Sequence, residues 1–446
     1  MRTCDPAPGT THDARLCLFV AVSIAGVTLT ACDGGGARRQ SSIDALPRLA
    51  ADADMRIGDV HDPDVGFSRV GGVDVDREGN IFVLEAAVPE IRTYGPDGTI
   101  RRRIGRRGGG PGEFESVPWF GVAGDTIWTV HTRGVSRIAL FDRDGNVLAT
   151  GRSDGVVVPL PERCGVLFPR MMRPDGTFAS HFGRVSDSCE GLAVAADAQP
   201  DTSARVPIVR FDAFGNVIDT IGWTGRPPPR MWTANATAEF QSSIRYADIG
   251  GRRKVVPTPP MARPWLEAMT DGYLLVDTPL AETQGEGVIT VTRFGLDEDT
   301  VYHRVLRYEP DRYSAAELDT IAARAARREP GGMLPVETQF AGRTAAVPDD
   351  WEVIARALRA EMRFPEFKLP LRTVWVAQDQ SVWLRRDDGD AATARWIVLD
   401  PGGEPRGQLE LPSSVRIVWS RGDRFWAVVP DENDVEWIER FRMRAG

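Results

Sequence analysis

A pattern of four short apolar segments joined by tight turns recurs six times along this chain of 446 residues. In the clearest copy, residues 72–84 hold two apolar runs around a turn at 76–80, and residues 91–101 hold two more around a turn at 95–99. The first turns of the other copies fall at 123–125, 173–176, 270–272, 377–380 and 420–423. Self-similarity of this kind is the signature of a repeat architecture, and it constrains the fold before composition is considered.

The second and third segments of each copy are rich in Val, Ile, Phe, Trp and Tyr, which favour β-strands. The second segments lie at 81–84, 127–130, 177–180, 273–276, 382–384 and 424–429, and the third at 91–94, 136–141, 208–211, 288–294, 395–399 and 435–441. Four-stranded antiparallel units repeated around an axis form a β-propeller. We therefore predict an all-β fold, a six-bladed β-propeller over residues 52–446.

The last unit contains only three strands before Gly446, and residues 54–58 echo residues 100–105 at the end of the first unit. An N-terminal strand that completes the last blade would close the ring and remove its exposed edges. We therefore expect residues 54–58 to close the propeller, the alternative being an ordinary lead-in strand.

Residues 72–84, continued by the glycine-rich stretch 105–114, resemble an NHL-type repeat. The chain as a whole resembles the bacterial six-bladed propeller lipoproteins, and the likeness covers residues 52–443 in outline. The motif is strong in the first blade, fair in the second, third and fifth, and weak in the fourth and sixth. The resemblance implies a fold and little about activity.

Residues 16–30 are apolar or small, with Arg2 and Arg15 ahead of them. This run is shorter than the roughly 20 residues that span a bilayer, and it is typical of a secretory signal. It ends in Leu29-Thr30-Ala31-Cys32, which resembles the lipobox of bacterial lipoproteins, where the signal is cut before the cysteine and the thiol carries lipid. The alternative is a plain signal peptide with a chance cysteine.

The lipobox resemblance implies an exported protein, periplasmic or surface-exposed, whose lipid on Cys32 anchors it to the cell membrane or outer membrane. Residues 1–32 are then the signal and lipobox, and residues 33–51 are expected to form a flexible tether. No later segment is apolar enough to span a bilayer, so we expect membrane contact through the lipid alone.

The chain carries 54 basic and 63 acidic side chains, a net charge of −9. Nucleic acid is therefore not expected as a partner, because binding phosphates requires a basic footprint. Beyond residue 32 the cysteines are Cys164 and Cys189. An even pair in an exported protein suggests a disulfide across one hairpin, and two buried free thiols are the alternative.

The connections of the predicted blades differ in length between the two faces of the propeller. In an up-and-down four-stranded unit, the first and third connections lie on one face, here the short-turn face. The second connection and the link to the next blade lie on the other, here the loop face. The long insertions, at 181–207, 223–263, 278–287 and 307–371, all belong to the loop face. Because loops on a rigid scaffold carry function, we expect ligand binding on the loop face. We expect the short-turn face to look toward the membrane.

The insertion at 307–371, between the fourth and fifth blades, is expected to contain two helices. Ser314 and Glu317 have the spacing of a capping box, and apolar residues then recur at helical spacing. The second helix is expected after Pro348. The pair either packs on the propeller rim for stability or forms one wall of a ligand cleft, and these roles are compatible.

We expect a protein, peptide or glycan ligand on the loop face, because arginine forks and indole faces suit acidic glycans and peptide carboxylates. The alternative is surface arginine in an arginine-rich chain, with tryptophans wedged between blades. The candidate ligand-binding residues are Arg106, Arg107, His131, Arg133, His181, Trp223, Trp232, Arg385 and Arg386.

The alternative function is a metal-dependent lyase or hydrolase on the same face. His61, His131 and His181 map there, and three imidazoles can hold Zn²⁺. The NHL-type amidating lyases use histidines from several blades, but the matching position in the first blade is Pro89.

Lactonase-like hydrolases bind Ca²⁺ through central carboxylates, which Asp74 and Glu85 could supply. The alternative is that Glu85 braces its adjoining loop. The glycine run 108–112 has no Lys-Ser/Thr and no following helix, so it is not a phosphate loop. We predict no metal or cofactor and identify no catalytic residue.

Overall fold

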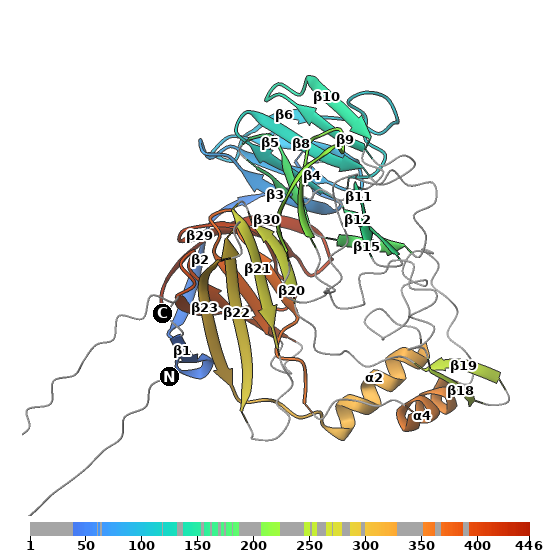
Figure 1. Cartoon of the computed structure of the whole chain (residues 1–446). Helices are drawn as coiled ribbons and strands as arrows, with labels where there is room; N and C mark the ends of the chain where they lie inside the picture. The colour runs from blue at the N-terminus through green and yellow to red at the C-terminus, as the bar shows by residue number, and fades with distance from the viewer. Residues whose placement is uncertain are drawn as a thin grey trace, which may run out of the picture. The chain divides into compact units, whose positions relative to one another are not determined.

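The computed structural model of the chain describes residues 39–59, 61–62, 65–117, 119–131, 137–152, 156–160, 163–167, 171–173, 175–180, 182–186, 207–223, 245–249, 252–256, 265–269, 271–278, 286–295, 299–327, 351–361, 367–386 and 392–446. Figure 1 shows their secondary structure, which is mostly strand. No helix within these ranges is long and apolar enough to cross a membrane.

Three sheets are antiparallel and four-stranded. The first has the order β3-β4-β5-β6 (Val70–Val75, Ile81–Glu85, Glu90–Tyr94, Ile100–Ile104). The second contains β7, β8, β9 and β10 (Trp119–Ala123, Thr126–His131, Arg137–Phe141, Val147–Arg152). The third contains β13, β14, β16 and β17 (Met171–Met172, Phe178–Ser180, Pro207–Phe211, Val217–Trp223).

Two larger sheets include strands from the N-terminal segment. A five-stranded sheet adds β1 (Arg39–Ser42) to β20, β21, β22 and β23 (Trp265–Met269, Gly272–Asp277, Gly287–Gly295, Thr300–Tyr308). An eight-stranded sheet has the order β24-β25-β26-β27-β2-β30-β29-β28. Its strands are Thr373–Val376, Val382–Arg386, Thr393–Leu399, Pro405–Pro412, Arg48–Ile57, Glu436–Ala445, Arg424–Pro430 and Arg416–Arg421, in that order.

Strands of neighbouring sheets lie beside one another. β3 contacts both β7 and β28, β7 contacts β13, and β20 contacts β14 and β24. Buried apolar clusters fill the spaces between the sheets, such as the one that joins Phe82 and Leu84 to Ile127 and Phe141. The fold is therefore all-β with a propeller-like arrangement, as the repeat predicts.

A recurring turn connects strands on the short-turn face. In the turns that begin at Asp76, Asp142 and Asp212, the aspartate carboxylate accepts hydrogen bonds from the backbone and side-chain amides of the asparagine four residues later. The glycine before each asparagine has a positive φ of 84–87°, a conformation that glycine adopts without strain. This explains why the Asp-x-x-Gly-Asn pattern marks the joints of the repeat.

The N-terminal strand predicted at 54–58 is longer than expected. β2 begins at Arg48 and pairs antiparallel with β30, from Leu49 opposite Ala445 to Ile57 opposite Ile438. At its start it also pairs parallel with β27, through Arg48 and Leu49. The prediction that an N-terminal strand pairs with the last unit is confirmed.

Residues 39–51 of the segment expected as a flexible tether belong to the fold, which corrects that boundary. β1 pairs parallel with β23, and the short 3-10 helix η1 (Ile43–Ala45) follows it. Ile43 is fully buried between the β20–β23 sheet and strands β24–β26, and this apolar contact holds the segment down. We call residues 39–49 the N-terminal strap.

The connections between the repeat strands contain more regular structure than the sequence suggested. A three-stranded sheet joins β11, β12 and β15 (Val156–Leu160, Arg163–Leu167, Phe182–Ser186). A hairpin of β18 and β19 (Arg245–Ile249, Arg252–Val256) lies within 223–263, and β18 contacts a helix of the later insertion. Cys164 is in β12 opposite Ser186, and Cys189 lies outside the described residues, so their pairing stays a prediction.

The two predicted helices are present between β23 and β24. They are α2 (Ala315–Arg327) and α4 (Trp351–Glu361), which pack against each other in Figure 1 through a small apolar cluster. The capping box is confirmed, because the Glu317 carboxylate accepts hydrogen bonds from the Ser314 backbone amide and hydroxyl, and the Ser314 hydroxyl accepts one from the Glu317 amide.

Candidate functional site

The predicted ligand-binding residues that the structure describes are mostly engaged in contacts within the protein. Arg106 pairs with Glu113 at 2.9 Å, and its side chain is 81% exposed. Arg107 donates a hydrogen bond to the carbonyl of Ala87, and this contact links the 105–114 loop to the connection between β4 and β5. Arg106 therefore stays largely exposed, whereas Arg107 holds two loops together.

His131 does not lie on the surface, contrary to the prediction. It ends β8 and is only 2% exposed, with its ring packed edge-on against Phe114. Nε2 lies 3.0 Å from the Thr129 hydroxyl, while Nδ1 has no hydrogen-bond partner among the residues with described positions. Burial, with the charge of Arg137 nearby, lowers the pKa of His131 to about 4, so the ring is neutral at physiological pH.

Arg385 and Arg386 end β25 and serve structural contacts. Arg385 donates to the carbonyl of Ser413 at 3.3 Å. Arg386 is buried, and its guanidinium lies 5.1 Å from the centre of the Tyr308 ring, at the end of β23. A buried arginine stacked on an aromatic ring of the next sheet is packing rather than a ligand contact, so Arg386 is removed from the predicted binding set.

Four of the predicted residues cannot be placed as side chains. Arg133, His181 and Trp232 lie outside the described residues. Trp223 is the last residue of β17, opposite Pro207, and only its backbone is described. Their proposed roles stay predictions.

The metal-site alternatives do not converge among the described residues. No group of three or more His, Cys, Asp or Glu side chains within these ranges is arranged to hold a metal ion. Glu85 is fully buried and accepts hydrogen bonds from the backbone amides of Ser68, Arg69 and Ala87. This confirms the interpretation that Glu85 braces its adjoining loop.

A polar cluster at the short-turn ends of four strand units was not predicted. At its centre is Asp74 of β3, whose carboxylate accepts hydrogen bonds from the amides of Val75 at 2.8 Å and Val122 at 2.7 Å. The Gln378 side chain, between β24 and β25, donates a third at 3.2 Å. Gln378 in turn accepts hydrogen bonds from Trp419 and Arg421 of β28. We call these residues the Asp74 cluster.

The pKa values of two neighbouring aspartates, Asp74 and Asp76, are shifted in opposite directions. Burial raises the pKa of Asp74 to about 6, against the opposing effect of its amide donors and of Arg421. Burial also acts to raise the pKa of Asp76, but hydrogen bonds from Asn80 and Arg143 outweigh it and lower that pKa. A carboxyl with a raised pKa is a candidate functional group, because perturbed acids concentrate at functional sites.

The geometry of the Asp74 cluster favours a brace over a catalytic acid. Both carboxylate oxygens of Asp74 already accept hydrogen bonds from the protein, and these bonds tie β3, β7, β24 and β28 together. The only sign of this cluster in the sequence was the polar residue Asp74 near the end of strand β3. It was not decisive, because Gln378 is more than 300 residues away in the chain.

Comparisons with known proteins do not assign this chain to a family. No family model matches it, and no curated protein matches it. Among solved structures, a protein from Bacteroides fragilis named "Putative exported protein" is 10% identical, with a TM-score of 0.43, over 91% of this chain and 98% of that one.

Two further solved structures are similar at the same low level. A member of the duf4221 family from Bacteroides vulgatus is 9% identical, with a TM-score of 0.40, over 89% of this chain and 99% of that one. The PQQ-bound aldose sugar dehydrogenase from Streptomyces coelicolor is 12% identical, with a TM-score of 0.37, over 90% and 100%. These values are too low to transfer a function.

Proposed function

We propose that this chain is an exported, lipid-anchored, six-bladed β-propeller that binds a protein, peptide or glycan on its loop face. Support for six blades comes from the eight-stranded sheet, which divides into two four-stranded halves at the short parallel contact between β27 and β2. With the three four-stranded sheets and the β20–β23 unit, these halves make six units, in which β28 of the last contacts β3 of the first.

The binding proposal rests on one observation, that the connections at the two ends of the strands differ in length. At one end, the described connections are short turns closed by backbone hydrogen bonds, such as those from Asp76 to Asn80, Gly95 to Thr99 and Asp400 to Glu404. At the other end, the chain between β23 and β24 carries α2 and α4. Elaboration of one end is what a rigid scaffold with a binding face requires.

The anchoring proposal is supported by the direction of β1. This strand runs parallel to β23, which leaves the short turn at 295–299 and rises toward the loop face. Within β1, Arg39 is therefore nearer to the short-turn face than Ser42 is. Six residues, 33–38, separate the expected lipid on Cys32 from β1, and fully extended they span about 20 Å. A short tether favours a short-turn face that looks toward the membrane.

Site-specific photo-crosslinking on intact cells or membrane vesicles tests the binding face. A photoreactive residue would replace Val88, between β4 and β5, or Val353 on α4, both about half-exposed on the loop face. Phe214, at the tip of a short turn and 58% exposed, provides the matched control.

We expect crosslinks to a discrete protein or glycan from Val88 and Val353 and none of the same product from Phe214. The proposal is wrong if the product forms from Phe214 and not from the other two positions. A metal-dependent lyase or hydrolase is not proposed, since Asp74, Glu85 and His131 are each held in separate protein contacts.

A further inference from the structure

A β-bulge recurs in the six strand units, where the third strand pairs with the fourth, outer strand. In each pairing the register slips by one position, so one residue of the outer strand has no residue opposite it. In the second unit, Val147 lies opposite Phe141 and Ala149 lies opposite Leu140, which leaves Leu148 between them. Because a bulge re-aims the side chain at its position, each unit presents one side chain in an equivalent place. Counted from the β3–β6 sheet, the bulge residues are Arg101, Leu148, Ile218, Val301, Arg406 and Asp54.

Units two, three and four carry exposed aliphatic side chains at the bulge. Leu148, Ile218 and Val301 are 57%, 45% and 46% exposed, and we call them the apolar rim. Eight large apolar side chains are exposed among the described residues, and six of them lie in the turn before an outer strand or in its first two residues. Those six are Ile100, Val147, Leu148, Phe214, Ile218 and Val301. Single exposed apolar residues are ordinary on protein surfaces, but that does not explain their recurrence at one structural position.

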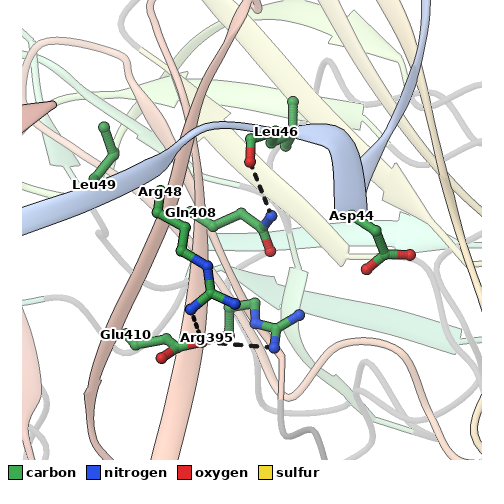
Figure 2. A pocket seen from close by; sticks show the side chains of 7 residues that line it. All are labelled: Asp44, Leu46, Arg48, Leu49, Arg395, Gln408 and Glu410. Carbon is green, nitrogen blue, oxygen red and sulfur yellow. Dashed lines mark hydrogen bonds and ion pairs between the residues drawn. The ribbon is translucent and has the colours of Figure 1, made fainter. Parts of the chain in front are cut away.

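Units five and six use the bulge position for contacts within the protein. Arg406 donates a hydrogen bond to the carbonyl of Gly422, and Asp54 accepts one from Arg440 at 2.6 Å. Figure 2 shows the strap lying across the outer strand of unit five, where Gln408 donates a hydrogen bond to it. The bulges of units five and six are therefore engaged by the protein itself, whereas those of units two to four expose aliphatic groups.

Carboxylates near the apolar rim are paired with arginines. Asp144, in the turn before β10, lies 2.9 Å from Arg102 of the preceding unit. Asp219, which follows Ile218, pairs with Arg210 at 2.5 Å. An unpaired carboxylate would oppose the transfer of its neighbours out of water, because a lone charge is costly in an apolar medium. The pairing reduces this cost at two of the three rim positions.

The N-terminal end of β1 lies near the rim residue of unit four. Arg39 is opposite Arg304, which comes three residues after Val301 in β23. Residues 33–38 separate Arg39 from Cys32, and fully extended they span about 20 Å. A lipid on Cys32 would therefore hold the bilayer in the neighbourhood of this part of the rim.

We propose that the apolar rim inserts into the surface of the phospholipid bilayer to which the chain is anchored, an inference that rests on the lipid anchor proposed above. Equivalent residues of units repeated around one axis lie at the same level along that axis, so a flat surface can meet all three rim residues together. Burial of apolar area drives such contact, and it adds to the attachment that a covalent lipid provides.

A protein partner fits the rim less well than a bilayer does. The energetically important residues of protein interfaces are enriched in Trp, Tyr and Arg, whereas Leu and Val are under-represented. The rim instead offers one aliphatic side chain from each of three separate units. A fluid apolar phase accepts such side chains singly and requires no matching pocket.

Photo-crosslinking to phospholipids tests this inference on the full chain in membranes from producing cells, whose lipids are labelled with radioactive fatty acids. A photoreactive residue would replace each residue of the apolar rim in turn. Val88 and Val353, which are 50% and 49% exposed, are the matched controls. We expect about fivefold more lipid adduct from each rim position than from the controls, which is the preference that burial of half a Leu or Val side chain provides.

The three rim residues should act together. Ile218→Thr combined with Val301→Thr should lower the lipid adduct from position 148 about tenfold, because two of the three apolar contacts are weakened. Val88→Thr combined with Val353→Thr is the matched control and should leave that adduct unchanged. All four substitutions are at exposed positions, so the fold should be kept. High salt should not reduce the adduct, since ions screen charges and not apolar contacts.

Equal lipid adducts from the rim and the controls, or none from the rim, would overturn the inference. A protein adduct in place of lipid, or loss of the lipid adduct at high salt, would also overturn it. Mass spectrometry of the N-terminal peptide reads the proposed anchor separately. If Cys32 carries no lipid, that anchor is wrong, and the same photoreactive chains mixed with phospholipid vesicles decide the inference by the same comparison.

Discussion

Replacement of Asp74 by asparagine should reveal an acid that stabilises the fold when it is protonated. Burial raises the pKa of Asp74 in the folded protein to about 6, against an ordinary value of 3.8. The folded state therefore binds this proton more tightly than the unfolded state does. The resulting stabilisation is full below pH 3.8 and is lost as the pH rises through about 6. Asp74→Asn has no such proton, so its stability lacks this component.

The difference of about 2.2 pKa units, from 3.8 to about 6, corresponds to at most about 3 kcal/mol. As the pH falls from 7.5 to 5, the linkage relation predicts that about 1.4 kcal/mol of this stabilisation appears, which is enough to measure. Urea unfolding followed by tryptophan fluorescence would give the free energy of unfolding of both proteins at each pH. The difference, unmodified chain minus Asp74→Asn, should grow by about 1.4 kcal/mol as the pH falls over that range.

Asp142→Asn in the β9–β10 turn is the matched control. A hydrogen bond from the Asn146 side chain lowers the pKa of Asp142, so its contribution is lost only below its ordinary value of 3.8. Its stability difference should therefore stay flat between pH 7.5 and pH 5. An equally flat difference for Asp74→Asn would mean that Asp74 titrates normally, and the account of the Asp74 cluster would be refuted.

Four further outcomes are expected. Ile43→Ala should lower the free energy of unfolding by about 3 kcal/mol, because it leaves a cavity under the strap. The control Val301→Ala, at a half-exposed position, should change it by less than about 0.5 kcal/mol. Equal effects of the two variants would contradict the buried placement of Ile43. Ser314→Ala should cost about 1 kcal/mol and increase hydrogen exchange at the start of α2, and unchanged exchange would argue against the cap. The His131 ring should stay neutral in an NMR titration until about pH 4, whereas a midpoint near 6.5 would show that it is solvated. Dialysis against a chelator should leave the melting temperature unchanged, and a stoichiometric metal with a lowered melting temperature would favour the lyase or hydrolase alternative.

The repeat predicted the strands well because strand and turn signals are local. The Asp-x-x-Gly-Asn turns and the Ser314–Glu317 capping box each depend on residues within five positions of one another. The boundary of the tether was wrong for the opposite reason. Whether residues 39–49 are ordered depends on Ile43 finding a place between two sheets, and nothing in the flanking residues reveals that contact.

The same distinction applies to the candidate sites. Glu85 was correctly interpreted as a brace, and its amide donors lie within 17 residues of it in the chain. His131 and Arg386 were expected on the surface because they end strands, but burial depends on Phe114 and Tyr308, which lie on other strands or loops. The Asp74 cluster and the hydrogen bond from Gln408 to the strap both combine residues more than 300 positions apart, which no single-sequence pattern can align.

The pairing of β2 with β30 has a consequence for biogenesis. Leu49 lies opposite Ala445, so segments far apart in the chain must meet before the last sheet is complete. Contacts this distant in sequence form slowly, since the intervening loop must first be closed. A nascent molecule would carry an unsatisfied strand edge until β30 emerges, and unpaired edges are prone to aggregation. Loss of β30 would therefore leave β2 and β29 each with an unpaired edge.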